Sequence, residues 1–136
     1  MENRELNNIL VIEDEEDIRK IVRVALEHGG NYTVELCSSA PEALDHLNSN
    51  QPDLILLDVM MPVMDGPTFL TELKNSETTK SIPVILMTAK VQSHELEQYK
   101  ELGVLGVISK PFDPVSLPQD IENMWQTMNT EIISPD

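Results

Sequence analysis

Basic residues, cysteine and long apolar runs are all scarce in this sequence, and each shortage excludes a class of protein. Only 9 lysines and arginines stand against 24 acidic residues, which gives a net charge of -15. A surface this acidic repels nucleic acid unless basic residues gather in one place. The one basic cluster is Arg19, Lys20 and Arg23, and its apolar neighbours indicate the solvated face of a helix. We therefore expect no nucleic-acid partner.

The single cysteine, Cys37, cannot form an intramolecular disulfide, which suits a reducing compartment. No basic and then apolar leader opens the chain, and no apolar run approaches the length that crosses a membrane. We expect a cytoplasmic protein without membrane contact. Its 136 residues suit a single domain over 1–136, with a core from about residue 8 to 128 and a tail over 129–136.

Five short apolar runs alternate with helical patterns along the chain. The runs cover residues 8–12, 32–37, 54–58, 82–87 and 106–109. Leu54 to Leu57 show no polar alternation, which is typical of a parallel strand that is buried on both faces. Ser39 and Glu42 form a capping box that begins a helix, and Pro118 indicates that the last helix starts near Leu117. The alternation predicts a doubly wound α/β fold with a five-stranded parallel sheet.

Polar residues follow four of the predicted strands, at the ends that share one edge of a parallel sheet. They are Glu13 and Asp14, Asp58, Thr88, and Lys110. If the first and third strands are neighbours, three carboxylates meet in one crevice. Three like charges so close stay ionised only where a cation offsets them, and an all-oxygen site suits Mg²⁺. Taken alone, Asp58 is explained equally well as a functional carboxylate and as a solvated aspartate at the end of a strand.

The combination of Mg²⁺, an aspartate, a hydroxyl and a lysine favours phosphoryl transfer. The expected Mg²⁺ ligands are Asp14 and Asp58, with the Met60 backbone carbonyl as a third and Glu13 acting through water. A metal-held carboxylate can attack phosphorus in line while a lysine and a hydroxyl bind the equatorial oxygens. Singly, Thr88 is typical of a helix cap and Lys110 of a surface cation, so only their joint placement supports this chemistry.

The sequence resembles the receiver domains of two-component response regulators over nearly its whole length, from Ile9 to about Met128. The matching segments are residues 9–15, 53–62, 64–66, 88–89 and 106–113. The resemblance implies the flavodoxin-like fold with strand order 2-1-3-4-5 and a cis Lys110–Pro111 bond. It also implies that a sensor histidine kinase or phosphotransfer protein phosphorylates Asp58, with Mg²⁺ bound by Asp14, Asp58 and the Met60 carbonyl, supported by Glu13.

The same resemblance implies that Thr88 and Lys110 bind the phosphoryl oxygens and that phosphorylation reshapes the surface of the fourth helix, fifth strand and last helix. A downstream protein would read that surface. This chain itself would be a monomer or a phosphorylation-dependent dimer. The chain departs from the family at Val107, where members often carry Tyr or Phe as a switch. A valine cannot swing over comparable distances, so we expect weaker or differently routed coupling. The resemblance also implies that Met60 and Lys90 occupy positions that flank the phosphoryl group, where we expect them to tune the access of water.

Two alternatives remain beside a stand-alone signalling switch that catalyses only its own phosphorylation and dephosphorylation. One is a Mg²⁺-dependent aspartyl phosphohydrolase, although the short segment 59–66 offers neither a second acid/base nor a substrate lid. The other is a degenerate receiver that binds a partner without phosphorylation. The intact set of Glu13, Asp14, Asp58, Thr88 and Lys110 argues against it.

Overall fold

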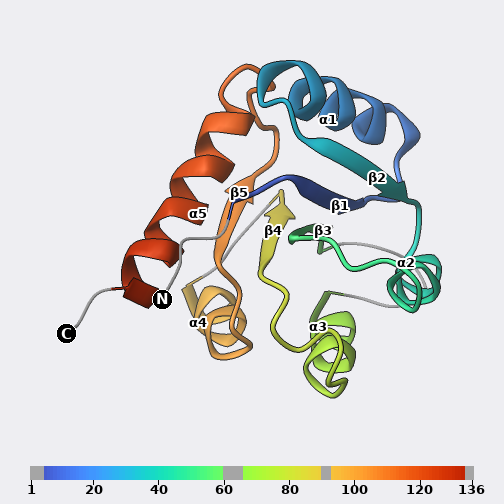
Figure 1. The fold of residues 1–136 in the computed structure, drawn as a ribbon, viewed down its shortest axis with the longest axis vertical. Helices are drawn as coiled ribbons and strands as arrows, with labels where there is room; N and C mark the ends of the chain where they lie inside the picture. The colour runs from blue at the N-terminus through green and yellow to red at the C-terminus, as the bar shows by residue number, and fades with distance from the viewer. Residues whose placement is uncertain (1–4, 60–65, 90–92, 134–136) are drawn as a thin grey trace.

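The computed structural model describes residues 5–59, 66–89 and 93–133, which form a five-stranded parallel sheet with helices on both faces (Figure 1). The strand order is β2-β1-β3-β4-β5, as the resemblance implied. The strands are β1 Asn8–Ile12, β2 Thr33–Cys37, β3 Leu54–Asp58, β4 Val84–Thr88 and β5 Gly106–Ser109. The helices are α1 Glu16–Gly29, α2 Ala40–Leu47, α3 Gly66–Lys74, α4 Ser93–Glu101 and α5 Leu117–Ile133.

The sheet separates two apolar cores, which explains why its central strands lack polar alternation. Helices α1 and α5 lie against one face, and α2, α3 and α4 lie against the other (Figure 1). Along β3, Leu54 and Leu56 point to the first face while Ile55 and Leu57 point to the second. All four side chains are fully buried. The predicted strand burial is therefore confirmed, and Asp58 emerges from a rigid, doubly covered strand.

Strand register sets where the polar residues meet. Ile12 pairs with Leu57 between β1 and β3, and Asp58 pairs with Met87 between β3 and β4. Thr88 pairs with Ser109 between β4 and β5, so Lys110 follows directly at the same edge. The carboxyl ends of four strands thus lie side by side, with β1 and β3 as neighbours at the reversal of strand order.

The structure corrects one prediction about local structure and confirms most of another. Helix α5 does begin at Leu117, as Pro118 indicated, but it continues to Ile133, so the predicted tail from residue 129 starts inside a helix. The Glu42 backbone N–H donates to Ser39 Oγ at 3.2 Å, as in a capping box. The Glu42 carboxylate, however, accepts from the backbone N–H and hydroxyl of Ser38, at 2.6 and 2.9 Å, one residue earlier than expected.

Cys37 behaves as a small apolar residue, as predicted. Its side chain is buried in the core that faces α2 and α3, and burial raises the pKa of the thiol to about 11. None of the described helices is long and apolar enough to span a bilayer.

Candidate functional site

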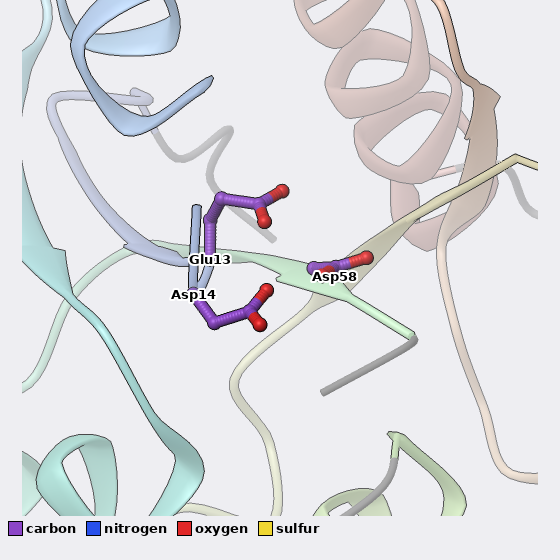
Figure 2. A group of neighbouring side chains, drawn as sticks. All are labelled: Glu13, Asp14 and Asp58. Atoms are coloured by element: carbon purple, nitrogen blue, oxygen red, sulfur yellow. The ribbon is translucent and has the colours of Figure 1, made fainter. Parts of the chain in front are cut away.

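Three carboxylates gather where β1 and β3 end. One oxygen from each of Glu13, Asp14 and Asp58 lies within 4.8 Å of the others, and Figure 2 shows the three side chains near one another. Glu13 and Asp58 are buried, whereas Asp14 is exposed. The predicted meeting of these residues in one crevice therefore agrees with their placement in the structure.

The turn after β1 is fixed by bonds to its backbone. Glu13 N–H donates to Cys37 O at 3.0 Å, which extends the contact between β1 and β2 by one residue. The Arg19 guanidinium donates from Nη1 to the carbonyl oxygens of Glu13 at 2.8 Å and Asp14 at 3.0 Å. Sequence reasoning placed Arg19 on a solvated helix face and missed this role. The available signal was its position in the first turn of a helix that follows an acidic loop.

Lys110 supplies the positive charge of the site. Its Nζ donates to Glu13 Oε1 at 2.7 Å and to Asp58 Oδ1 at 3.1 Å. The backbone N–H of Lys110 donates to Thr88 O at 2.8 Å, and the Lys110–Pro111 peptide bond is cis, as the resemblance implied. The lysine thus joins the ends of β1, β3 and β5.

The pKa values of Glu13 and Lys110 follow from their burial and from the contact between them. Burial raises the pKa of Glu13 to about 7, although the hydrogen bond from Lys110 works in the opposite direction. Burial lowers the pKa of Lys110, but its hydrogen bond to Glu13 and the nearby carboxylates outweigh that effect and hold its pKa above the usual value. The lysine is therefore charged at neutral pH. One lysine does not balance three carboxylates, so the arrangement favours a further cation.

The donor set suits a hard divalent ion. Carboxylate oxygens are the ligands that Mg²⁺ prefers, and the exposed Asp14 leaves room for the water ligands this ion retains. Glu13 already binds Lys110, which fits the supporting position expected for it better than direct ligation. Met60, whose carbonyl was the third expected ligand, lies outside the described residues, and so does Lys90.

Thr88 and Val107 occupy the neighbouring strands. Thr88 is the last residue of β4 and is buried, one residue beyond the position that pairs with Asp58. Val107 pairs with Leu86 and packs, partly buried, against the core that faces α2, α3 and α4. Thr88 therefore lies at the edge that carries the carboxylates, whereas Val107 lies farther back along β5.

Comparison with known proteins identifies relatives of this chain. A family model for the response regulator receiver domain matches residues 9–122. The chain is 35% identical over 117 residues to the response regulator Rre1 of Synechocystis, covering 86% of this chain and 51% of the relative. It is 40% identical over 121 residues to the phosphate regulon transcriptional regulatory protein PhoB of Escherichia coli, covering 89% and 52%. The chain spans about half the length of these curated relatives.

Solved structures agree in fold. The chemotaxis response regulator CheY4 of Vibrio cholerae superposes with a TM-score of 0.80 at 28% identity, covering 88% of this chain and 99% of that one. A putative response regulator from Chloroflexus aurantiacus gives a TM-score of 0.79 at 26% identity, covering 90% and 99%.

Removing the lysine should destabilise the fold, because two buried carboxylates then lose their cation. We expect Lys110→Met to lower the free energy of unfolding by about 3 kcal/mol without Mg²⁺, measured by urea denaturation. Adding Glu13→Gln to that variant should recover part of the loss. Lys100→Met, at an exposed lysine of α4, serves as the control. Equal stability of the two lysine variants would contradict the assignment of Lys110 as the balancing charge.

Proposed function

The chain belongs to the response regulator receiver domain family, whose members are phosphoacceptors of two-component signalling, and we propose that Asp58 is its acceptor residue. The observation that carries this proposal is the position of Asp58 between two other carboxylates and Lys110 at the carboxyl edge of the sheet. No other arrangement among the described residues joins a carboxylate nucleophile to a candidate metal site and a cation.

The reaction follows from these contacts. A carboxylate oxygen of Asp58 attacks the phosphorus of the donor, a P–O bond forms, and the bond from phosphorus to the donor atom breaks. The leaving group departs with the electron pair and takes up a proton. For a sensor histidine kinase or phosphotransfer protein, that leaving group is an imidazole nitrogen. The product is an acyl phosphate on Asp58.

The chain's own groups position and stabilise the transferred phosphoryl group. Lys110 already contacts Asp58 Oδ1 at 3.1 Å, so its ammonium can follow the negative charge from the carboxylate to the phosphoryl oxygens. We infer that the hydroxyl of Thr88, at the end of the adjacent strand, binds another of these oxygens. Mg²⁺, held by Asp14 and Asp58, would neutralise phosphoryl charge when bound.

An apolar surface beside the site suits the donor protein. Three large apolar side chains are exposed among the described residues: Ile21 by 45%, Val24 by 57% and Val115 by 88%. Ile21 and Val24 lie on α1, and together with Val115 they line a hollow of about 630 Å³. An adjoining hollow of about 370 Å³ connects Ile21 with Lys110. Docking here would place a phosphorylated histidine next to Asp58, because the second hollow ends at the lysine that contacts it.

The acceptor assignment is tested with acetyl phosphate as the donor. Incubation with Mg²⁺ should add one phosphoryl mass to the intact protein, and Asp58→Asn should abolish the addition. Asp45→Asn, at an exposed aspartate of α2, should leave it unchanged. An unmodified wild type would contradict the proposal, and rapid multi-turnover hydrolysis of acetyl phosphate would identify a phosphohydrolase instead.

The metal assignment is tested by calorimetric titration with Mg²⁺. We expect Asp14→Asn to weaken binding by at least about tenfold, because it removes a ligand. Glu16→Gln removes an acidic side chain nearby in sequence but outside the cluster, and should leave the affinity close to that of wild type. Similar losses in both variants would indicate a diffuse electrostatic effect and would contradict a defined site.

The docking surface is tested by comparing a protein donor with a small one. Val24→Glu should slow transfer from a histidine-phosphorylated donor domain about tenfold or more, because it places a charge in an apolar contact. The same variant should accept phosphate from acetyl phosphate at the wild-type rate. If protein and small-molecule donors are affected equally, Val24 does not contribute to docking.

A further inference from the structure

Arg19 holds the backbone on both sides of the Asp14 Cα. Its Nη1 donates to the carbonyl oxygen of Glu13 at 2.8 Å and to that of Asp14 at 3.0 Å. These carbonyls belong to the two peptide groups that flank Asp14, so one nitrogen restrains both of its backbone dihedral angles. The guanidinium is charged, which makes such hydrogen bonds stronger than those between neutral groups. Arg19 therefore fixes the direction in which the Asp14 side chain leaves the backbone.

The usual support of a turn that leads into a helix is missing here. Glu15 is the N-cap of α1, but its side chain makes no capping hydrogen bond within the described part of the chain. A capping side chain would otherwise bind the first backbone N–H groups and fix the approach of the chain. The Glu15 backbone N–H donates instead to Glu13 Oε2, at 3.2 Å. Asp14 is exposed, so packing does not orient it either, and the turn depends on Arg19.

The segment between β2 and α2 supports Arg19 from the other side. Hydrogen bonds from the backbone and hydroxyl of Ser38, together with the positive charge of Arg19, lower the pKa of Glu42. Glu42 is therefore ionised at neutral pH and attracts the guanidinium. The half-buried Arg19 thus lies between the acidic turn and a fixed carboxylate, which limits its own freedom.

Two effects of Arg19 on a bound Mg²⁺ have opposite signs. Its positive charge opposes the binding of a second cation, and water at this exposed turn screens that repulsion. Its hold on the Asp14 backbone favours binding, because a ligand that is already in place loses little conformational freedom when the ion arrives. Within the described residues Arg19 forms no salt bridge with the three carboxylates, so it does not compete with the ion for their oxygens. The geometric effect should therefore dominate.

We propose that Arg19 is a positioning residue, which orders the turn that carries Asp14 and thereby raises the affinity of the three-carboxylate site for Mg²⁺. The second half of this proposal rests on the metal site of the proposed function. The first half does not, because order in the turn is a property of the metal-free protein.

Hydrogen exchange of the metal-free protein tests the first half. The reporters are the amides of Glu13 and Glu15, which donate to Cys37 O and to Glu13 Oε2. In EDTA, Arg19→Met should speed their exchange by about fivefold or more, because the turn opens locally. The amides of β4 should exchange at the wild-type rate, since only a global loss of stability would expose them.

Arg23→Met is the matched control. It removes an arginine one turn farther along α1, where Arg23 pairs with Glu27 at 3.4 Å, and it should leave exchange in the turn unchanged. Equal exchange in wild type and Arg19→Met, equal acceleration in the two arginine variants, or acceleration that extends equally to β4 would each overturn the ordering role.

Calorimetric titration with Mg²⁺ tests the second half. We expect Arg19→Met to weaken binding about tenfold, at the lower end of the effect of groups that orient metal ligands from outside. Arg23→Met should change the affinity by less than about twofold, because its charge is exposed and screened. The sign of the change separates the possible roles. An effect of charge alone predicts tighter binding in Arg19→Met, and an effect on stability alone predicts unchanged binding by the folded protein, so either result would overturn the proposal.

A conservative variant isolates the two hydrogen bonds. Both come from the single nitrogen Nη1, so the ammonium that Arg19→Lys introduces can replace them in part. The Mg²⁺ affinity of this variant should lie between those of wild type and Arg19→Met. An affinity no higher than that of Arg19→Met would overturn the assignment of the effect to these bonds.

Phosphorylation by acetyl phosphate, read from the intact mass, gives a separate measurement. In Arg19→Met the Mg²⁺ concentration for the half-maximal rate should rise about tenfold, and the rate at saturating Mg²⁺ should stay within about twofold of wild type. A lower maximal rate with an unchanged half-saturating concentration would overturn the proposal. A wild type that binds no Mg²⁺ would instead contradict the proposed function and the second half with it, while hydrogen exchange would still decide the first half.

Discussion

The contact of Lys110 with two buried carboxylates is the interaction on which the rest of this site depends. Glu13 and Asp58 are almost inaccessible to water, and Asp14 adds a third negative group within 4.8 Å. Such a cluster is costly unless cations neutralise it, because buried like charges repel strongly. The lysine offsets only part of that charge, at 2.7 and 3.1 Å from its partners. The remaining imbalance favours the binding of a metal ion at the three carboxylates.

The strand order of the fold brings together the residues that form this contact. A parallel sheet places the ends of all its strands on one edge, and the order β2-β1-β3-β4-β5 makes the acidic ends of β1 and β3 neighbours. Lys110 reaches them from the edge strand, across β4. Lys110 directly follows β5 and is the first residue of the segment that connects β5 to α5.

Much of the fold and of the candidate site could be predicted from the sequence, because the patterns that indicate them are local or lie at the ends of strands. The buried run Leu54 to Leu57 and the residues after each strand placed Glu13, Asp14 and Asp58 at one edge of the sheet. The strand order that makes them neighbours came from the family resemblance and agrees with the structure. Other features depended on tertiary structure. Arg19 had the composition of a solvated helix residue, and only the folded turn revealed the carbonyls that it binds. The extension of α5 to Ile133 was missed, although no glycine or proline interrupts residues 128–133 and the sequence therefore contains no signal that ends the helix there.

The central claim is that the phosphoryl group resides on Asp58 and on no other carboxylate of the cluster. Borohydride reduces an acyl phosphate to an alcohol, so an aspartate that carried the phosphoryl group becomes homoserine and can be located by peptide sequencing in a mass spectrometer. After treatment with acetyl phosphate and Mg²⁺, the account predicts homoserine at position 58 alone. Modification at Glu13 or Asp14, with Asp58 unchanged, would contradict it.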